Sequence, residues 1–488
     1  MESRSTNSSL ILNVDWFTII LYMVLVIAGI FSIYAASYDF DNASIMSATE
    51  FSGKQIRWIG MAFVLALVLL LFDSRMYEAY AYPIYIVVML ILLVTIFVAP
   101  DIKGSHSWLV LGPLRFQPAE FGKFATALCL AKIFSGYNFK LNASRNNYFR
   151  VLFVIILPML LIIAQKETGS ALAYSALFFV LYREGMSGLV LMAAACAVVF
   201  FVVAVKYTST IYLGLPVGEV AVFLMIMCIM VGLLAIYCKH LTAARNVAIW
   251  YISTFTIVAI LDACGIPVPG LIYFLSAIVV ACGYCMLLTV RSQARKLWIT
   301  IGATVASVVF LFSVNYAFDS ILQPHQQQRI KVTLGIVDDP LGKGYNVNQS
   351  RIAIGSGGLA GKGFLNGTQT KLKYVPEQHT DFIFCTIGEE QGFIGSSLVL
   401  ILFLGLILRV MHIAERQPTV FGRVYGYSVA SYFIFHLAIN VGMVIGLCPV
   451  IGIPLPFFSY GGSSLWSFTF LLFILLRIDA SRREHLSY

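Results

Sequence analysis

Charged residues are scarce in this chain of 488 residues: Asp, Glu, Lys and Arg make up 11% of it, against roughly 25% in soluble domains. Hydrophobic residues make up 60%, and the mean hydropathy is +0.88. The shortage of charge excludes an ordinary soluble globular protein. The composition instead predicts an all-α polytopic membrane protein with about 14 transmembrane helices and a large extracytoplasmic loop.

The chain also lacks the cysteine pattern of a disulfide framework, because its nine cysteines are scattered and lie mostly inside apolar segments. Cys282 and Cys285 have the C-x-x-C spacing of redox and zinc sites. They lie in an apolar run without a second pair or nearby histidines, so we interpret them as small residues at a helix contact.

Long apolar runs are abundant. A hydrocarbon core of about 30 Å requires about 20 apolar residues per helix. Fourteen runs approach that length: 16–37, 56–72, 80–99, 118–135, 151–165, 168–182, 188–206, 218–238, 246–262, 267–290, 297–316, 391–411, 424–446 and 461–477. We interpret the first as an uncleaved span. The runs 151–165 and 168–182 are predicted to be two short helices that meet at an outer bend at Gln165, Lys166 and Glu167.

The net charge of +9 is concentrated in alternate short loops. The basic residues of these loops are Lys140, Arg145, Arg150, Arg183, Lys239, Arg245, Arg291, Arg295, Lys296, Arg409, Arg416, Arg423, Arg477, Arg482 and Arg483. Because basic loops stay in the cytoplasm, the pattern predicts that both chain ends are cytoplasmic and that the long loop 317–390 is extracytoplasmic. The charge is thus a topology signal, and no nucleic-acid partner is expected.

The outer loop contains the polar segment YVPEQHTDFIF, residues 374–384, with Glu377, His379, Thr380 and Asp381 close together. A carboxylate next to Phe382 and Phe384 near a membrane surface is expected to be partly desolvated, which raises its pKa toward the range of a general base. Neighbouring polar side chains could orient it. The alternative is that Asp381 or Thr380 is only the N-cap of a short helix.

Upstream in the same loop, residues 349–370 (QSRIAIGSGGLAGKGFLNGTQT) are rich in glycine. Such backbone could bring N–H groups close to a phosphate, or the glycines could simply form turns. A P-loop is excluded, since Lys362 is followed by Gly363 and not by Ser or Thr.

Charged residues inside apolar runs are candidates for function because their burial in lipid is costly. Glu120 and Lys123 are three residues apart and can pair on one helix face, either to position that helix or to contact substrate. Arg115, Lys123 and Lys166, near the outer surface, could complement a pyrophosphate, as could Lys362. Each one taken alone could equally be a snorkelling or solvated side chain.

Several motifs resemble those of the SEDS family, the RodA and FtsW proteins of bacterial cell-wall synthesis. They are the segment from QSRIAIGSGG to GEEQGFIGSS, LRFQPAEFGKFATALCLAK (114–132), QKETGSA (165–171), GRVYGYS (422–428), NVGMVIGLCPVIGIPLPFFSYGGSS (440–464) and the basic tail. The resemblance covers nearly the whole chain except residues 206–297. PLPFFSYGGSS and FGRV are more similar to the RodA branch than to the FtsW branch.

The resemblance implies a peptidoglycan glycosyltransferase that polymerises lipid II into glycan strands at the outer face of the bacterial cytoplasmic membrane, during cell elongation and shape control. It implies that Asp381, in the HTDF motif, is the catalytic residue, acting as the base of an inverting transfer. It also implies a class B penicillin-binding protein as partner. The residues expected to bind substrate are Glu377, His379, Thr380, Lys362, Arg115, Glu120, Lys123, Lys166, Glu167, Ser459 and Gly461.

A divalent cation, Mg²⁺ or Mn²⁺, would help to neutralise the pyrophosphate leaving group, but no cluster of ligands in the sequence identifies a metal site. The chain also departs from the family pattern at three places. Ser107 precedes Trp108 where the family often has Arg, QPAE replaces QPSE, and Glu167 replaces the usual Asp of the Q-x-D-x-G-T motif. These departures make the expected contacts with the donor and acceptor substrates less certain to follow the family pattern, and they leave the expected glycosyl transfer unchanged.

Residues 206–297 are predicted to be an insertion that raises the family's ten helices to fourteen. The expected domains are an N-terminal core (1–205), the inserted helices (206–297) and a C-terminal core (298–488) containing the catalytic loop 317–390. Four extra helices keep Asp381 outside, whereas an odd number would not. The insertion carries few charges in its spans, so a structural or partner-docking role is expected.

Two other classes of function compete with the enzyme. A many-helix protein with buried charges could transport or flip lipid-linked oligosaccharides, but such proteins often show inverted repeats and a broken helix at the midplane. The sequence has no convincing repeat, and its most polar segment is an outer loop. A scaffold that recruits a partner and has lost activity is the third possibility, and it is disfavoured because the HTDF motif is complete.

Overall fold

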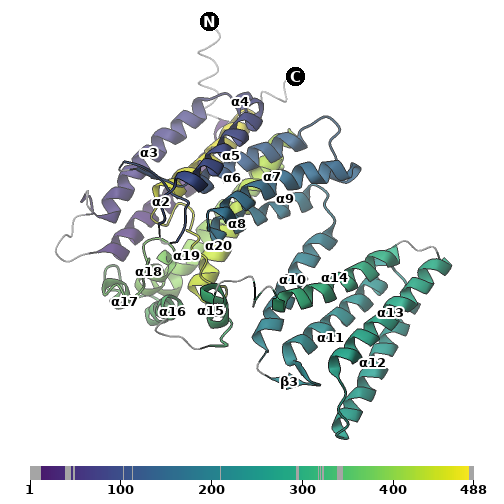
Figure 1. The fold of residues 1–488 in the computed structure, drawn as a ribbon. Coiled ribbons are helices and arrows are strands. Elements are labelled where there is room, and N and C mark those ends of the chain that lie inside the picture. The colour runs from purple at the N-terminus through teal and green to yellow at the C-terminus, as the bar shows by residue number, and fades with distance from the viewer. Residues whose placement is uncertain are drawn as a thin grey trace. The chain divides into compact units, whose positions relative to one another are not determined.

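The computed structural model describes residues 13–38, 45–47, 50–102, 104–112, 114–208, 210–292, 296–316, 318, 320, 324–337 and 344–482. Parts of the predicted outer loop 317–390, and the basic residues Arg295 and Arg483, lie outside the described residues. The chain forms two compact units. Unit 1 comprises Met1–Ser187 and Tyr345–Tyr488, and unit 2 comprises Gly188–Gly344 (Figure 1).

Unit 1 is built almost entirely from helices. Its elements are α2 (Trp16–Ser37), α3 (Phe51–Leu71), α4 (Ser74–Ala79), α5 (Ala81–Val98), β1 (Leu109–Leu111), β2 (Leu114–Phe116), α6 (Pro118–Phe134), η1 (Leu141–Ala143), α7 (Arg145–Ala164), α8 (Thr168–Ala173), η2 (Tyr174–Ala176), α9 (Leu177–Arg183), α16 (Tyr345–Gly357), α17 (Thr368–Lys371), α18 (Ile383–Glu390), α19 (Gly392–Glu415), α20 (Val420–Val444) and α21 (Gly462–Ala480). Strands β1 and β2 form an antiparallel hairpin that pairs Val110 with Arg115.

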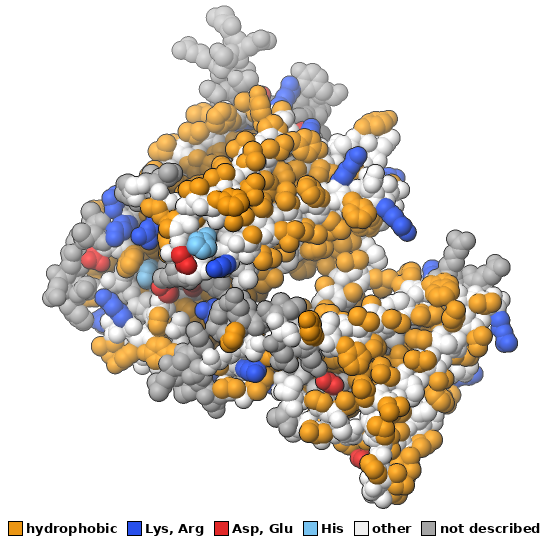
Figure 2. Space-filling view, in the orientation of Figure 1, with side chains coloured by type: hydrophobic (Ala, Val, Ile, Leu, Met, Phe, Trp, Pro, Cys, Tyr) orange, Lys and Arg blue, Asp and Glu red, His pale blue; other side chains and the backbone are white. Residues whose placement is uncertain are grey.

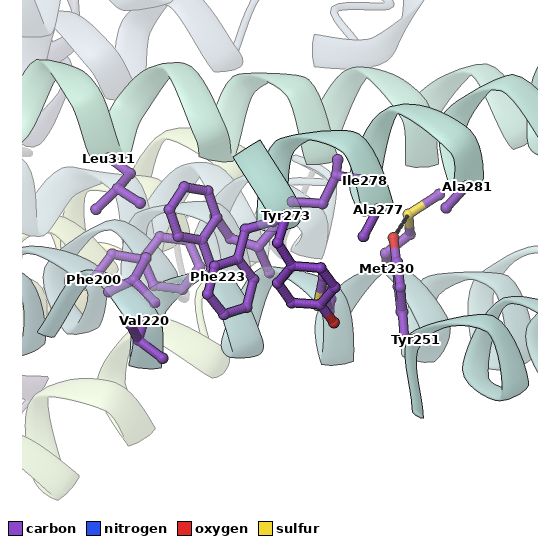
Figure 3. Packing of buried hydrophobic residues seen from close by; sticks show 14 of the residues in the cluster. Phe200, Val220, Phe223, Met230, Tyr251, Tyr273, Ala277, Ile278, Ala281 and Leu311 are labelled. Atoms are coloured by element: carbon purple, nitrogen blue, oxygen red, sulfur yellow. Dashed lines mark hydrogen bonds between the residues drawn. The ribbon is translucent and has the colours of Figure 1, made fainter. Parts of the chain in front are cut away.

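Unit 2 has its own helices and its own core. Its elements are α10 (Gly188–Lys206), β3 (Ile211–Tyr212), β4 (Leu215–Pro216), α11 (Val217–Gly232), the π-helical turn η3 (Leu233–Tyr237), α12 (Leu241–Ala263), α13 (Gly270–Ser292), α14 (Lys296–Tyr316) and α15 (Pro324–Thr333). The rings of Phe223 and Phe274 stack 5.0 Å apart in the core, and the Tyr251 hydroxyl donates to the Met230 sulfur at 3.0 Å (Figure 3).

The compact unit is larger than the predicted insertion. Helices α10 and α14, assigned from the sequence to the two core domains, pack with α11 in unit 2. The predicted domain limits at 206 and 297 therefore stay a prediction. On the face shown in Figure 2, hydrophobic side chains predominate over both units, and the charged side chains of unit 1 are concentrated toward one side.

The predicted polytopic all-α class is confirmed, but the number of fourteen spans is not. Twelve helices of the described chain are long and apolar enough to cross a membrane. The remaining two predicted spans differ from regular spanning helices. Of the predicted span 118–135, residues Pro118–Phe134 form α6, which has 17 residues and contains Glu120 and Lys123. Residues 168–182 are divided among α8, η2 and α9.

Six ion pairs of unit 1 join segments that the alternation of spans assigns to the cytoplasmic side. They are Asp15–Arg409, Asp15–Arg416, Arg416–Asp479, Arg183–Glu415, Arg423–Glu184 and Lys132–Glu78. Helix α4, which carries Glu78, lies at one end of unit 1, and α16, α17 and α18 lie at the other end (Figure 1). The segments that the charge pattern assigns to opposite sides of the membrane thus lie at opposite ends of unit 1. Which end faces the cytoplasm stays a prediction.

The glycines of the outer loop allow α16 to approach α18 closely. A Cβ atom at Gly357 would lie 2.0 Å from the carbonyl oxygen of Gly388. Beyond α16, Gly361 has a φ of +78°, and the next two N–H groups donate to the carbonyl oxygens of Glu389 and Glu390 at 3.0 and 2.9 Å. These N–H groups are therefore used inside the protein, and close packing and turns account for the glycines better than a phosphate cradle does.

We expect Gly357→Ala to destabilise unit 1, by about 1 to 3 kcal/mol, because a backbone atom of α18 must move. The matched control is Gly355→Ala in the same helix, where nothing lies within 4 Å of the added Cβ. That change should leave the protein equally or slightly more stable. Apparent melting temperatures of the purified chain in detergent compare the two, and equal effects of both variants would contradict the packing argument.

Candidate active site at one end of unit 1

Asp381 lies in the turn that precedes α18, where its side chain is half-buried. Helix α18 begins at Ile383, and its N-cap position is Phe382, which makes no side-chain cap hydrogen bond. Thr380 donates instead to the carbonyl oxygen of Glu377 at 3.2 Å. Neither Thr380 nor Asp381 thus occupies the N-cap position that the alternative explanation of the motif requires.

Asn440 of α20 holds the backbone of this turn. Its side chain is fully buried, and its Nδ2 donates to the Asp381 carbonyl oxygen at 2.9 Å and to the Ile453 carbonyl oxygen at 2.7 Å. A buried amide in a membrane protein is costly without such partners. Asn440 therefore fixes the Asp381 turn to the segment 445–461, and it is a site residue that the sequence prediction missed.

The segment 445–461 lies between Asp381 and the bend after α7. A Cβ atom at Gly452, whose φ is +75°, would lie 3.4 Å from Asp381 Oδ2, so glycine brings the backbone up to the carboxylate. On the adjoining residue, the Ile451 carbonyl oxygen would lie only 2.5 Å from a Cβ at Gly169 in α8. The QKETGSA segment and Asp381 thus both approach the backbone of residues 451 and 452.

Glu167 occupies the N-cap position of α8, where its carboxylate is held by neighbouring polar groups. Gln117 Nε2 donates to Glu167 Oε1 at 2.5 Å, and the Ser170 hydroxyl donates to the same oxygen at 3.0 Å. Burial raises the pKa of the Glu167 carboxyl, although hydrogen bonds from Ser107, Ser170 and Gln117 oppose the rise. Lys166 beside it has a φ of +61° and an exposed side chain.

Aromatic rings surround His379. Its imidazole stacks on Phe51 with 4.1 Å between ring centroids, and its carbonyl oxygen accepts a hydrogen bond from the Tyr460 N–H at 2.9 Å. A pocket of about 220 Å³ adjoins it, lined by Ala36, Ser37, Glu50, Phe51, Lys373, Val375, Pro376, Glu377, Gln378 and His379. The structure therefore brings His379 and Glu377 together at one cavity, next to the Asp381 turn.

Gln378 anchors this turn to the rest of unit 1. Its side chain is buried, and its Nε2 donates to the Ala36 carbonyl oxygen and, at 2.9 Å, to the Thr370 carbonyl oxygen. The sequence prediction passed over Gln378 although it lies inside the motif. No pattern in the sequence distinguishes a buried anchor from its exposed neighbour Glu377.

Lys362 is paired inside the outer loop. Its Nζ lies 2.8 Å from Glu389 Oε1 and 2.7 Å from the Thr368 hydroxyl. Burial alone would raise the pKa of Glu389, but the Lys362 ammonium and the N–H groups of Gln369 and Thr370 lower it overall. These contacts give Lys362 a structural role, and its contact with substrate stays a prediction.

Glu120 and Lys123 lie deep in unit 1, with 3% and 0% of their side chains exposed. Lys123 Nζ is 2.9 Å from Glu120 Oε2 and 3.0 Å from His436 Nε2, and it lies 4.5 Å from the ring centre of Phe468. His436 Nδ1 in turn is 3.1 Å from the Pro454 carbonyl oxygen. The pair thus supports the helix packing behind segment 445–461, and direct contact with substrate stays a prediction.

The other predicted residues lie around the same end. Arg115 is exposed on β2, and its carbonyl oxygen accepts from the Ser463 hydroxyl at 3.3 Å. Ser459 is buried, and its hydroxyl accepts from the Leu455 N–H at 2.9 Å. Gly461 is the N-cap of α21, and its N–H donates to Gln55 Oε1 at 3.2 Å. Ser459 and Gly461 thus shape the turn before α21, while Arg115 is free to face outward.

The chain matches, over residues 15–224 and 227–484, the family model FtsW/RodA/SpoVE, described as cell cycle protein. The chain is therefore a polytopic membrane protein that belongs to the FtsW/RodA/SpoVE family. The matched residues include most of the segment 206–297, in which the sequence analysis identified no family motif.

Relatives that align over most of their own length support the assignment. The chain is 28% identical over 467 residues to the peptidoglycan glycosyltransferase RodA of Treponema pallidum (strain Nichols), covering 96% of this chain and 97% of the relative. It is 29% identical over 414 residues to the peptidoglycan glycosyltransferase MrdB of Escherichia coli (strain K12), covering 84% and 81%.

Two solved structures share the fold. One, described as structural coordination of polymerization and crosslinking by a peptidoglycan synthase complex, has a TM-score of 0.59 at 22% identity, covering 96% of this chain and 98% of that one. The other, the rod shape determining protein RodA of Thermus thermophilus, has a TM-score of 0.54 at 21% identity, covering 96% and 97%.

Glu390 generates a pH-dependent prediction. Its side chain is 3% exposed, and burial raises its pKa from 4.5 to about 7, so the folded state favours the protonated form. The stability that it contributes is complete below about pH 4.5 and is lost as the pH rises through about 7. At about pH 8, Glu390→Gln should therefore stabilise the chain, by up to about 3 kcal/mol, and near pH 4 it should change little.

Melting temperatures in detergent at the two pH values test this expectation. The control is Glu415→Gln, which removes a carboxylate with 52% of its side chain exposed and paired with Arg183. The control should give no stabilisation at either pH, because an exposed carboxylate bears little desolvation cost. If the melting temperature of Glu390→Gln equals that of the wild type at both pH values, the Glu390 carboxyl ionises freely in the folded protein and the prediction is wrong.

Proposed function

We propose that this protein is a peptidoglycan glycosyltransferase that polymerises lipid II into glycan strands at the outer face of the bacterial cytoplasmic membrane, in cell elongation and shape control. The proposal is supported by its family, whose relatives carry that activity in their names. The observation that carries it is the position of Asp381, whose backbone is fixed by Asn440 and whose carboxylate is approached by the Gly452 backbone.

The reaction requires a base at this point. The 4-hydroxyl oxygen of the acceptor sugar attacks the anomeric carbon of the donor, and a new glycosidic C–O bond forms. Asp381 takes the hydroxyl proton onto a carboxylate oxygen, while the bond from the anomeric carbon to the pyrophosphate breaks and its electron pair leaves with the lipid pyrophosphate. Inversion at the anomeric carbon follows from this single displacement.

Substrate contacts follow from the surroundings of Asp381. The stacked rings of His379 and Phe51 and the adjoining pocket of about 220 Å³ offer apolar and polar surface to a sugar. The exposed cations Arg115 and Lys166 are suited to a pyrophosphate, Arg115 through bidentate hydrogen bonds. Thr380 and Glu377 complete the polar rim on the side of the motif.

A divalent cation stays an expectation from pyrophosphate chemistry. In the part of the chain that the structure describes, no group of three or more His, Cys, Asp and Glu side chains could hold a metal ion. No step of the proposed reaction is therefore assigned to a cation.

The proposal includes a partner. One structural relative was solved as part of a peptidoglycan synthase complex that couples polymerization and crosslinking, which fits a class B penicillin-binding protein as the partner of this chain. We also propose that the chain resides in the cytoplasmic membrane, where a multi-pass protein meets lipid II on the outer side of that membrane.

The decisive variant is Asp381→Ala. Purified protein is incubated with labelled lipid II, alone and together with a class B penicillin-binding protein, and the glycan polymer is measured. We expect polymer from the wild type and at least about a hundredfold less from Asp381→Ala, because a general base contributes that much or more. The control Asp101→Ala, which removes an exposed aspartate outside the Asp381 turn, should retain the wild-type rate.

Equal product from Asp381→Ala and the wild type would reject Asp381 as the base. If neither makes polymer but both move lipid-linked sugar across vesicle membranes, the transporter hypothesis replaces the enzyme. The scaffold hypothesis holds if the wild type and Asp381→Ala show neither polymerisation nor lipid transport of their own, while the partner polymerises lipid II only in the presence of the chain.

Asn440 is a positioning residue in this account. Asn440→Ala removes the two hydrogen bonds that connect the Asp381 turn with Ile453, so the rate at saturating lipid II should fall by about 10- to 100-fold with little change in KM. The matched control Ser428→Ala removes a buried hydroxyl on the same helix that bonds only within α20, to the Val424 carbonyl oxygen. An effect of Asn440→Ala on KM alone, or an equal effect of the control, would contradict the positioning role.

A further inference from the structure

A second pocket lies at the end of unit 1 that carries α4, away from the Asp381 turn. It has a volume of about 320 Å³ and is formed where α5, α6 and α7 meet the loop that joins α6 to α7. Its lining consists of Tyr82, Lys132, Ile133, Ser135, Gly136, Tyr137, Phe139 and Arg150. We call this set the Arg150 pocket. The charge pattern assigns this end to the cytoplasmic side.

The lining of the Arg150 pocket is positively charged. Lys132 and Arg150 contribute cations, and no carboxylate belongs to the lining. Glu78, just outside it, is 3.1 Å from Lys132 Nζ and accepts from the Ser135 hydroxyl at 3.2 Å. Within the described chain, no ion pair involves the Arg150 guanidinium, so one full positive charge faces the pocket without a carboxylate partner. Such a site favours a monoanionic group that can accept two hydrogen bonds from a guanidinium.

Apolar side chains continue from the pocket along the same helices. On α5, Ile86 and Leu90 follow Tyr82 at helical spacing and are 56% and 55% exposed. On α7, Phe153 follows Arg150 by three residues and is 61% exposed. The two helices are in contact, and the Tyr85 hydroxyl donates to the Val154 carbonyl oxygen at 3.0 Å. A cationic pocket at the membrane surface therefore adjoins an exposed apolar face inside the membrane.

This combination fits a lipid better than a free anion. We propose that the Arg150 pocket binds the phosphodiester headgroup of an anionic phospholipid of the cytoplasmic leaflet, with its acyl chains along the exposed faces of α5 and α7. Basic pockets between transmembrane helices on the cytoplasmic side bind such headgroups in other membrane proteins. Soluble phosphate shares the headgroup chemistry but cannot use the apolar face. The proposal does not depend on glycosyl transfer.

The test is lipid binding by the purified full-length chain. The delipidated protein in detergent is titrated with phosphatidylglycerol and, separately, with phosphatidylcholine, and bound lipid is counted by native mass spectrometry. We expect one phosphatidylglycerol site that phosphatidylcholine does not fill. Arg150→Gln should weaken this site about fivefold, the factor expected for one basic residue near a membrane surface, while Arg150→Lys should retain most of the affinity.

Arg145→Gln is the matched control, because Arg145 is an exposed arginine at the start of the same helix that does not line the pocket. It should bind phosphatidylglycerol like the wild type, and all variants should share the wild-type melting temperature. Equal weakening by Arg145→Gln and Arg150→Gln would reduce the effect to general surface charge and overturn the site. Displacement of phosphatidylglycerol by millimolar inorganic phosphate would overturn the lipid in favour of a soluble anion.

Discussion

The exclusion of charge from hydrocarbon is the constraint on which the arrangement of unit 1 depends. Six ion pairs that join different segments, among them Arg416 with Asp479 and Arg423 with Glu184, gather at one end of the unit, while Lys362 pairs with Glu389 at the other end. Lys123 lies deep inside and has Glu120 and His436 as partners, so its charge is not left without compensation. The other end is thereby left to the outer loop, where polar side chains can meet a substrate at the membrane surface.

Helix α20 connects this constraint with the candidate site. His436 and Asn440 lie one turn apart on it and contact the carbonyl oxygens of Pro454 and Ile453. Asn440 also holds the carbonyl oxygen of Asp381, so two buried polar side chains of one membrane helix position both the segment 445–461 and the proposed base. Hydrogen bonds between buried groups make rigid connections of this kind, since breaking either bond of the Asn440 Nδ2 group leaves a buried carbonyl oxygen without that partner.

Regular spans were predictable from the sequence, because apolar length and charged flanks are local properties. The predicted runs 16–37 and 188–206 coincide with α2 and α10. The short α6 and the broken segment from α8 to α9 deviate, since helices that are packed inside the protein need not match the bilayer in length or regularity.

The candidate site was predictable only in part. The segment around Asp381 was conspicuous because it is polar in an apolar chain, and the family motifs pointed to the same residue. Asn440, 59 positions away, was not found, because a contact between distant segments has no local signature. The glycines of the outer loop were ambiguous for the same reason: close packing of Gly357 on Gly388 requires knowledge of the partner helix.

The position of the Asp381 turn on the outer side of the membrane is tested most directly by thiol labelling in intact bacteria. Glu377→Cys, an exposed position in the same turn, and Arg145→Cys, at the opposite end of unit 1, are treated with a membrane-impermeant maleimide and compared with the wild-type chain. The account predicts labelling at position 377 in intact cells and at position 145 only after permeabilisation. Labelling of position 377 only after permeabilisation would place Asp381 on the cytoplasmic side, out of reach of externally presented lipid II, and would contradict the account.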